Sequence, residues 1–214
     1  MKDSSLKESV QIQVSALFDL HDCPHKALFD VKVVWEVLDQ LHGYLLKWGS
    51  KMEGELEDGV VLRNPHTISI GKGTRVESGA YICGPCVIGK NCEIRHGAYL
   101  RGDVLACDEC VIGHSTEVKN SIFLRGACAG HFAYVGDSIL GNHVNLGAGT
   151  KCANLRLDRA NIKIGKEDSG RHKLGAILGD SVQTGCNAVT NPGTIMAKGS
   201  WCLPCAVVKG YVHG

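Results

Sequence analysis

The chain has 214 residues, of which 44% are hydrophobic and 21% are charged, and its formal net charge is +1. This composition fits one globular domain with a buried core and a modest extension. The charge is nearly balanced and the basic residues do not form a run, so we expect neither nucleic acid nor an anionic membrane as a partner.

The N-terminal segment from Met1 to Val14 is polar and charged, and it lacks the apolar stretch of a secretion signal. No later segment has enough uninterrupted apolar residues to span a bilayer. We therefore expect a cytoplasmic protein. In that compartment the 11 cysteines are expected to be reduced thiols rather than a disulfide framework.

The first element expected along the chain is a single amphipathic helix from His25 to Lys47. Apolar residues recur in this segment at helical spacing, namely Leu28, Val31, Val34, Trp35, Leu38, Leu41 and Leu45. We expect this helix to pack on an open end of the following domain as a cap. It defines an N-terminal helical extension over residues 1–58.

Residues 59–214 show a period of six. An apolar residue recurs at every sixth position, at Ile70, Val76, Ile82, Ile88, Ile94, Leu100, Ala106, Ile112, Val118 and Leu124. Four residues after each of these comes a small or β-branched residue, from Thr74 to Cys128. Neither a helix nor a simple strand has this period. The pattern resembles the hexapeptide-repeat family, whose all-β solenoid is a left-handed parallel β-helix of triangular section.

In such a fold three hexapeptides form one coil, so residues eighteen apart stack at the inter-strand spacing of about 4.8 Å. The register resumes at Leu140 and again at Leu178. Between these runs lie two interruptions, residues 125–139 and residues 155–177. We expect both to be loops expelled from the solenoid, which is where repeat proteins commonly carry function.

Four cysteines form two pairs that are spaced as in zinc sites, Cys83 with Cys86 and Cys107 with Cys110. The repeat places Cys86 and Cys110 in the inward column of small residues, on different faces of the triangle. We therefore expect them to pack in the core and to hold no metal. Cys92, Cys110 and Cys128 are eighteen apart and are expected to stack inside the coil.

Arg101 and Lys119 are also eighteen apart, so the repeat alone stacks these two cations on adjacent coils. Two interpretations remain open. The pair is either a solvated basic edge with Asp103 and Glu117 as partners, or a phosphate site. In a phosphate site the arginine would act as a forked donor and the lysine as a point charge.

Three segments carry a more specific signal, namely residues 130–137, residues 145–150 and the dipeptide Ala153-Asn154. They resemble the acetyltransferase domain of bifunctional bacterial enzymes that make UDP-N-acetylglucosamine, and of their archaeal relatives. The similarity extends approximately from Ile88 to Val208. It implies an acetyl-CoA-dependent N-acetyltransferase acting on an amino-sugar phosphate of the glucosamine-1-phosphate type, with active sites between the subunits of a homotrimer.

The resemblance also implies roles for individual residues. The sugar phosphate would be bound by Arg101 and Lys119, and the amino sugar by Tyr134, Asn145 and Asn154. Acetyl-CoA would contact Ala148 and Cys186. His131 would be the catalytic base, because an amine attacks a thioester only as its free base and an imidazole titrates near neutral pH. We expect Glu117 to orient this imidazole.

The chain departs from the bacterial pattern at several points. Asn154 is followed by Leu155-Arg156-Leu157-Asp158 and later by Arg171-His172-Lys173, which resembles the archaeal branch more closely, and Cys186 replaces a serine. The nucleotidyltransferase half is missing, which suggests a separate nucleotidyltransferase partner.

Two alternatives remain. One is a metalloprotein similar to γ-class carbonic anhydrases, based on Leu100-Arg101-Gly102-Asp103 and on four candidate ligands, His96, His114, His131 and His143. The other is a non-catalytic partner subunit of a sugar nucleotidyltransferase.

Overall fold

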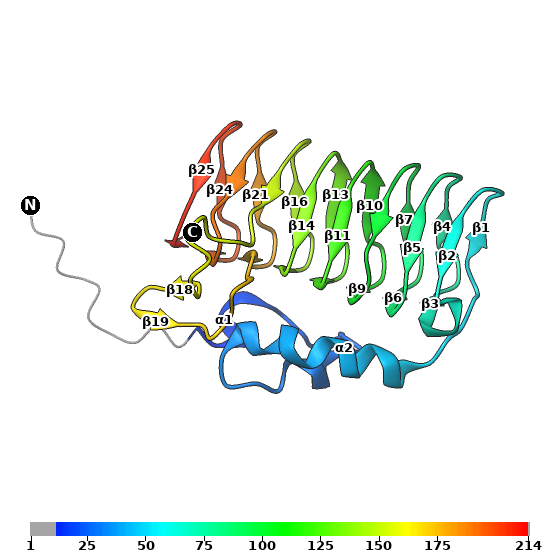
Figure 1. The fold of residues 1–214 in the computed structure, drawn as a ribbon, viewed down its shortest axis with the longest axis horizontal. Coiled ribbons are helices and arrows are strands. Elements are labelled where there is room, and N and C mark those ends of the chain that lie inside the picture. The colour runs from blue at the N-terminus through cyan, green and yellow to red at the C-terminus, as the bar shows by residue number, and fades with distance from the viewer. Residues whose placement is uncertain (1–11, 214) are drawn as a thin grey trace, which may run out of the picture.

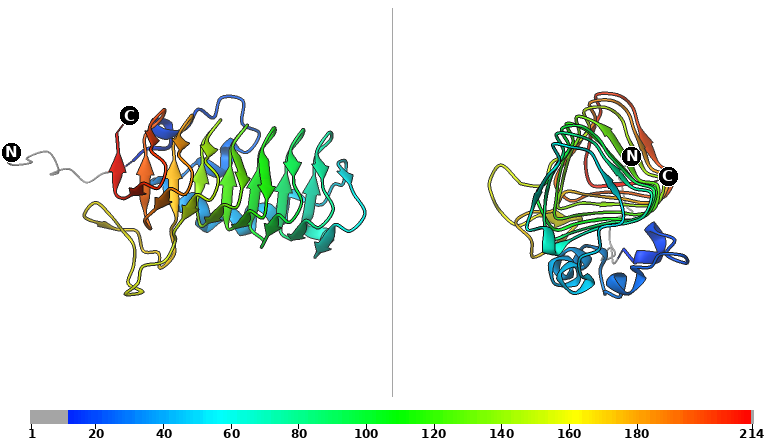
Figure 2. Two further views of the ribbon diagram at one scale, coloured as in Figure 1. Left: turned by 90° about the horizontal axis from the view of Figure 1, so that it is seen from above. Right: turned by 90° about the vertical axis from the view of Figure 1, so that its right-hand side faces the viewer.

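The computed structural model describes residues 12–213. Most of this part of the chain is a parallel β-solenoid with three flat faces, and each face is a sheet of eight strands (Figures 1 and 2). Seen from the end where the coil begins, the chain runs counterclockwise as it recedes (Figure 2, right). The coil is therefore left-handed, and the predicted fold class is confirmed.

Each coil contributes one strand to each sheet in turn. Sheet 1 contains β1 (Glu55–Leu56), β4 (Arg75–Val76), β7 (Glu93–Ile94), β10 (Val111–His114), β13 (Cys128–His131), β16 (Asn145–Leu146), β21 (Gln183–Thr184) and β24 (Trp201–Cys202). Sheet 2 contains β2 (Val61–Arg63), β5 (Tyr81–Cys83), β8 (Tyr99–Leu100), β11 (Glu117–Lys119), β14 (Tyr134–Gly136), β17 (Lys151–Cys152), β22 (Val189–Thr190) and β25 (Val207–Val208). Sheet 3 contains β3 (Ile68–Ile70), β6 (Cys86–Ile88), β9 (Val104–Ala106), β12 (Ser121–Phe123), β15 (Ile139–Leu140), β20 (Ala176–Leu178), β23 (Thr194–Met196) and β26 (Tyr211–Val212).

The hexapeptide register explains the core of the first coils. Ile82, Leu100 and Val118 are consecutive partners in sheet 2, each eighteen residues from the next, and all three are fully buried in the central cluster. Within the stack, these short strands are paired on both sides. Their backbone N–H and C=O groups therefore find partners in the neighbouring coils and not in water. The apolar column inside the triangle supplies the burial that stabilises the pairing.

Two successive corners between sheets 2 and 3 are one residue shorter than the repeat. Tyr99 pairs with Glu117, eighteen residues on, but Val104 pairs with Ser121, only seventeen residues on. The next coil is shortened again, since Ile122 pairs with Ile139. The expected loop over residues 125–139 is therefore wrong. That segment contains β13 and β14. Its length is not a multiple of six because two corners have each lost one residue.

The shortened corners shift the side chains that follow them. Phe123 rather than Leu124 enters the central cluster, and Ala127 takes the inward position that was expected for Cys128. Cys128 lies half-buried on the outer side of sheet 1, whereas Cys110 is buried inside as predicted. A one-residue slip moves a side chain to the opposite face of a strand, which accounts for these corrections.

A third irregularity follows at the same corner. Ile139 pairs with Ile177 across thirty-eight residues instead of eighteen, so twenty additional residues leave the coil between β17 and β20. We call residues 155–173 the excursion. It contains a two-stranded antiparallel hairpin of β18 (Lys163–Ile164) and β19 (Glu167–Asp168).

The N-terminal extension is not the single helix expected from His25 to Lys47. Its helical elements are α1 (Val14–Leu17), 3₁₀ turns at Lys26–Phe29 and Val34–Glu36, and α2 (Val37–Trp48), and a further 3₁₀ turn, Pro65–Thr67, precedes β3. The break has a local cause, because the Glu36 carboxylate accepts hydrogen bonds from the backbone N–H groups of Lys32 and Val33 and so caps the helix start. No helix within residues 12–213 is long and apolar enough to cross a membrane.

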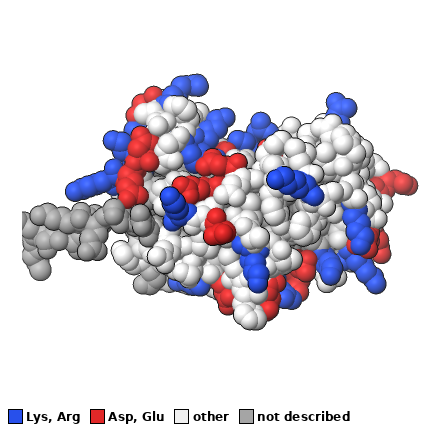
Figure 3. Space-filling model, turned by 90° about the horizontal axis from the view of Figure 1, so that it is seen from below, with Lys and Arg blue, Asp and Glu red and all other residues white. Residues whose placement is uncertain are grey.

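The extension covers sheet 3 along its length rather than an open end of the coil, so the expected cap is wrong (Figure 1). The outward side chains of sheet 3 are apolar and buried beneath it, namely Val87, Leu105, Ile122, Ile139, Ile177 and Ile195. A face of this composition requires a cover, and α2 supplies one with Leu38, Leu41 and Leu45. The charged side chains on the outside of this covered face are of both signs and interspersed (Figure 3).

Leu41→Ala should lower the free energy of unfolding by about 2–5 kcal/mol, because Leu41 is fully buried between α2 and sheet 3. Leu46→Ala on the same helix is the matched control, since Leu46 is 49% exposed. Urea unfolding followed by circular dichroism measures both. Equal stability of the two variants would contradict the packing of α2 on sheet 3.

Candidate functional site

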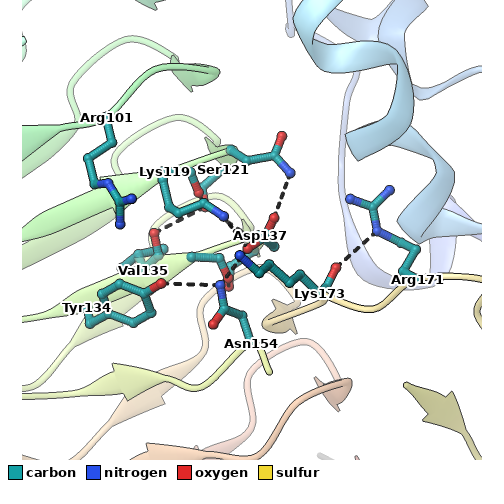
Figure 4. A network of polar contacts seen from close by, with 12 residues as sticks. Arg101, Lys119, Ser121, Tyr134, Val135, Asp137, Asn154, Arg171 and Lys173 are labelled. Atoms are coloured by element: carbon teal, nitrogen blue, oxygen red, sulfur yellow. Dashed lines mark hydrogen bonds and ion pairs between the residues drawn. The ribbon is translucent and has the colours of Figure 1, made fainter. Parts of the chain in front are cut away.

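A buried carboxylate lies at the corner between sheets 2 and 3. Asp137 is 3% exposed, and its backbone adopts the left-handed region with φ 51°. The carboxylate accepts hydrogen bonds from Lys119 Nζ at 2.9 Å, Asn120 Nδ2 at 2.8 Å and Asn154 Nδ2 at 2.5 Å (Figure 4). These donors offset the cost of burying its charge. Asp137 thereby joins side chains from three successive coils.

The predicted stacking of Arg101 and Lys119 is present. Each follows a strand residue of the same pair, Leu100 in β8 and Val118 in β11, so the two cations occupy one column on adjacent coils. Neither cation is unpaired. Arg101 donates to Glu117 at 2.7 Å, and Lys119, whose side chain is 19% exposed, pairs with Asp137. Glu117 therefore contacts Arg101, and its expected role of orienting His131 stays a prediction.

Tyr134 and Asn154 complete this edge of the molecule. Asn154 follows β17 and donates from Nδ2 to the Tyr134 hydroxyl at 3.2 Å as well as to Asp137. Tyr134 starts β14, and its ring extends along sheet 2 toward Asn154 (Figure 4). Four of the five residues predicted to bind the acceptor, Arg101, Lys119, Tyr134 and Asn154, thus lie together. We call them, with Asp137, the cation edge.

His131 lies elsewhere, at the corner between sheets 1 and 2. It ends β13, is exposed, and is in register with His114 of the preceding coil. Strand β14 lies between this corner and the side of sheet 2 that carries Arg101, Lys119 and Asp137, and its three residues span roughly 10 Å at the usual rise of about 3.3 Å per residue. One copy of the chain therefore does not bring the predicted base to the predicted phosphate site.

The residues predicted to contact acetyl-CoA lie at the same corner as His131, which we call the histidine edge. Gly149 donates its backbone N–H to the His131 carbonyl at 2.9 Å, and Asn187, beside Cys186, donates to the Ala148 carbonyl at 2.7 Å. Cys186 is exposed. Asn145 belongs to sheet 1, where it is also exposed, away from the cation edge.

The turn at Ala148 offers a donor for a developing negative charge. The N–H groups of Gly147 and Gly149 are both engaged, with the carbonyls of Thr184 and His131. Within residues 12–213 the N–H of Ala148 has no such acceptor. This narrows the possible oxyanion donors of the turn to one group.

Two of the four histidines considered as metal ligands lie against each other. His114 Nδ1 contacts the His96 carbonyl at 2.8 Å, and the two rings stack with centroids 5.6 Å apart. Across the described range 12–213, no group of three or more His, Cys, Asp or Glu side chains is arranged to hold a metal ion.

Sequence reasoning missed three participants at the cation edge, namely Asp137, Asn120 and the end of the excursion. Asp137 stood within a recognised segment, but it received no role because an acidic residue beside a turn is unremarkable. The change of spacing from eighteen to seventeen at Asn120 and Asp137 was the available signal. It marks a corner where three successive coils depart from the repeat.

Residues 82–200 match the family described as the GMPPB C-terminal domain. A bifunctional sugar-1-phosphate nucleotidylyltransferase/acetyltransferase of Sulfurisphaera tokodaii is 38% identical over 190 residues, which are 84% of this chain and 46% of that protein. The bifunctional protein GlmU of Methanocaldococcus jannaschii is 44% identical over 75 residues, which are 33% of this chain and 18% of that protein. The chain thus spans less than half the length of these two relatives.

Among solved structures, a UDP-N-acetylglucosamine acyltransferase of Francisella novicida has a TM-score of 0.47 at 16% identity, covering 74% of this chain and 60% of that one. The sequence matches confirm the resemblance that the motifs indicated.

Asp137→Ala should lower the free energy of unfolding by about 3–5 kcal/mol, because it leaves the largely buried Lys119 ammonium without its partner. Asp137→Asn should cost less, since the amide keeps one acceptor oxygen. Glu109→Gln is the control, because the Glu109–Arg125 pair is exposed on both sides and contributes little. Urea titration of the three variants measures this, and an Asp137→Ala protein as stable as the wild type would contradict the role of the carboxylate.

Proposed function

The chain belongs to the GMPPB C-terminal domain family, and we propose that it is an acetyl-CoA-dependent N-acetyltransferase acting on an amino-sugar phosphate of the glucosamine-1-phosphate type. The observation that carries this proposal is the cation edge, where Arg101 and Lys119 stack beside Tyr134 and Asn154. The similarity to a sugar-1-phosphate nucleotidylyltransferase/acetyltransferase supports the same acceptor class.

The side chains at this edge suit a sugar phosphate. A phosphate would take the free guanidinium N–H groups of Arg101 and the remaining N–H donors of Lys119, while Glu117 and Asp137 keep both cations in place. The Tyr134 hydroxyl and the Asn154 amide oxygen would accept from sugar hydroxyls. Carboxylates beside the cations also limit the local charge, which favours a small acceptor over a polyanion.

At the histidine edge, acetyl-CoA would lie along the corner formed by Ala148 and Cys186. His131 would remove the proton from the amino group as nitrogen attacks the thioester carbonyl, and the thiolate of CoA would leave. The Ala148 N–H would stabilise the oxyanion of the tetrahedral intermediate. Holding amine and thioester together would supply much of the rate.

The separation of the two edges supports a homotrimer. Sheet 3 is covered by the N-terminal extension, so sheets 1 and 2 are the faces that another copy can approach. Placing the histidine edge of one subunit against the cation edge of its neighbour would assemble base, cofactor site and acceptor site in one cleft. The cytoplasmic location and the separate nucleotidyltransferase partner remain predictions.

A non-catalytic subunit is the second candidate, because both cations of the phosphate site are already paired with carboxylates of the same chain. Such a protein would bind no acetyl-CoA. Isothermal titration with acetyl-CoA therefore separates the two functions, and micromolar binding favours the enzyme.

His131→Ala should lower turnover by about a hundredfold or more, because it removes the general base. Thiol release from acetyl-CoA with glucosamine-1-phosphate as acceptor measures this, with light scattering to show that the oligomer persists. His114→Ala is the matched control, since His114 occupies the same column one coil earlier. A His131→Ala protein as active as the wild type would overturn the role of His131.

A further inference from the structure

The excursion is fastened to the N-terminal extension. Arg171, near the end of the excursion, pairs through its guanidinium with the Asp39 carboxylate of α2. The Arg171 side chain is only 13% exposed. Ile162 and Ile164 of the excursion are buried in the same apolar cluster as α2. An ion pair therefore fastens the excursion to a segment more than a hundred residues earlier in the sequence, and the two isoleucines share the apolar cluster of that segment.

The end of the excursion is in turn fastened to the cation edge. Arg171 Nε donates to the Lys173 carbonyl at 3.3 Å, and Lys173 forms an antiparallel bridge with Leu155. The next residue, Leu174, donates its N–H to the Asn154 carbonyl at 3.0 Å, and Gly175 donates to the Asp137 carbonyl at 2.7 Å. The Lys173 side chain points toward Asp137 and Asn154 (Figure 4).

These contacts form a continuous path from α2 to the acceptor site. We infer that α2 is a positioning element for this site, with Asp39 and Arg171 as positioning residues that hold the returning segment 173–175 against Asn154 and Asp137. The inference rests on the proposed function for the identity of the acceptor. It gives the N-terminal extension a second role besides covering sheet 3.

The physical argument is one of local order. A segment that leaves a solenoid is not paired with strands of the neighbouring coils, and segments with few such contacts open locally at low free energy. Holding its end at two points reduces the conformations available to Asn154 and Lys173 before the acceptor binds, and an ordered site does not lose that entropy on binding. The Asp39 side chain is 60% exposed, and a fully exposed ion pair would contribute little, but its partner Arg171 is largely buried and also binds a backbone carbonyl.

The test compares Asp39→Asn and Arg171→Gln with the wild-type protein. Each variant should raise KM for glucosamine-1-phosphate about tenfold and leave KM for acetyl-CoA unchanged. Hydrogen exchange at the amides of Leu174 and Gly175 should quicken by a similar factor, because these amides bond to Asn154 and Asp137. The exchanged pair Asp39→Arg with Arg171→Asp should recover part of both effects.

Asp158→Asn is the matched control, since Asp158 pairs with Arg156 and also accepts from Ala160, both within the same excursion. It should change neither KM nor exchange. Unchanged exchange and unchanged acceptor KM in Asp39→Asn would overturn the inference, and so would an equal rise of both KM values, which indicates general loosening. Absence of turnover in the wild type would count against the proposed function instead, while the exchange comparison would still decide whether α2 orders the segment.

Discussion

The Asp137 carboxylate is the group on which the candidate site depends. It is buried at a corner where the chain turns through a left-handed residue, and its donors come from the coils before and after its own. A buried carboxylate is stable only with such partners, so the position of Asp137 fixes those of Lys119 and Asn154. The backbone of Asp137 also receives the returning excursion through Gly175. The irregular corners are therefore also the place where the polar side chains of the site come together.

A second constraint is that the solenoid has three faces with different neighbours. Sheet 3 carries apolar residues on both of its sides, and the extension buries the outer ones. The extension leaves sheets 1 and 2 uncovered, and their outer surfaces mix charged side chains with exposed Tyr99, Trp201 and Val207. The two edges of sheet 2 carry the two halves of the proposed chemistry. A narrow prism offers few concave sites, so a division of this kind is naturally completed by another copy of the chain.

The fold could be read from the sequence because a period of six leaves few alternatives, and the inward column from Ile70 to Val118 is placed correctly. The errors begin at Asn120, where the corner loses one residue. Leu124 is apolar and lies six residues after Val118, so the sequence pattern continues there although Leu124 faces outward. The outward column of Val87, Leu105 and Ile122 signalled a covered face, but a search for inward residues passes over it. The stacking of Arg101 and Lys119 followed from spacing, whereas the separation of His131 from them required the corners to be placed in space.

The central claim is that the cation edge binds the phosphate of the acceptor. The most direct measurement is the ratio of kcat/KM for glucosamine-1-phosphate to that for glucosamine, with acetyl-CoA as donor. Two charged contacts worth about 1.5–3 kcal/mol each predict a preference of roughly a hundredfold or more for the phosphorylated sugar. Equal values for the two acceptors would contradict the assignment.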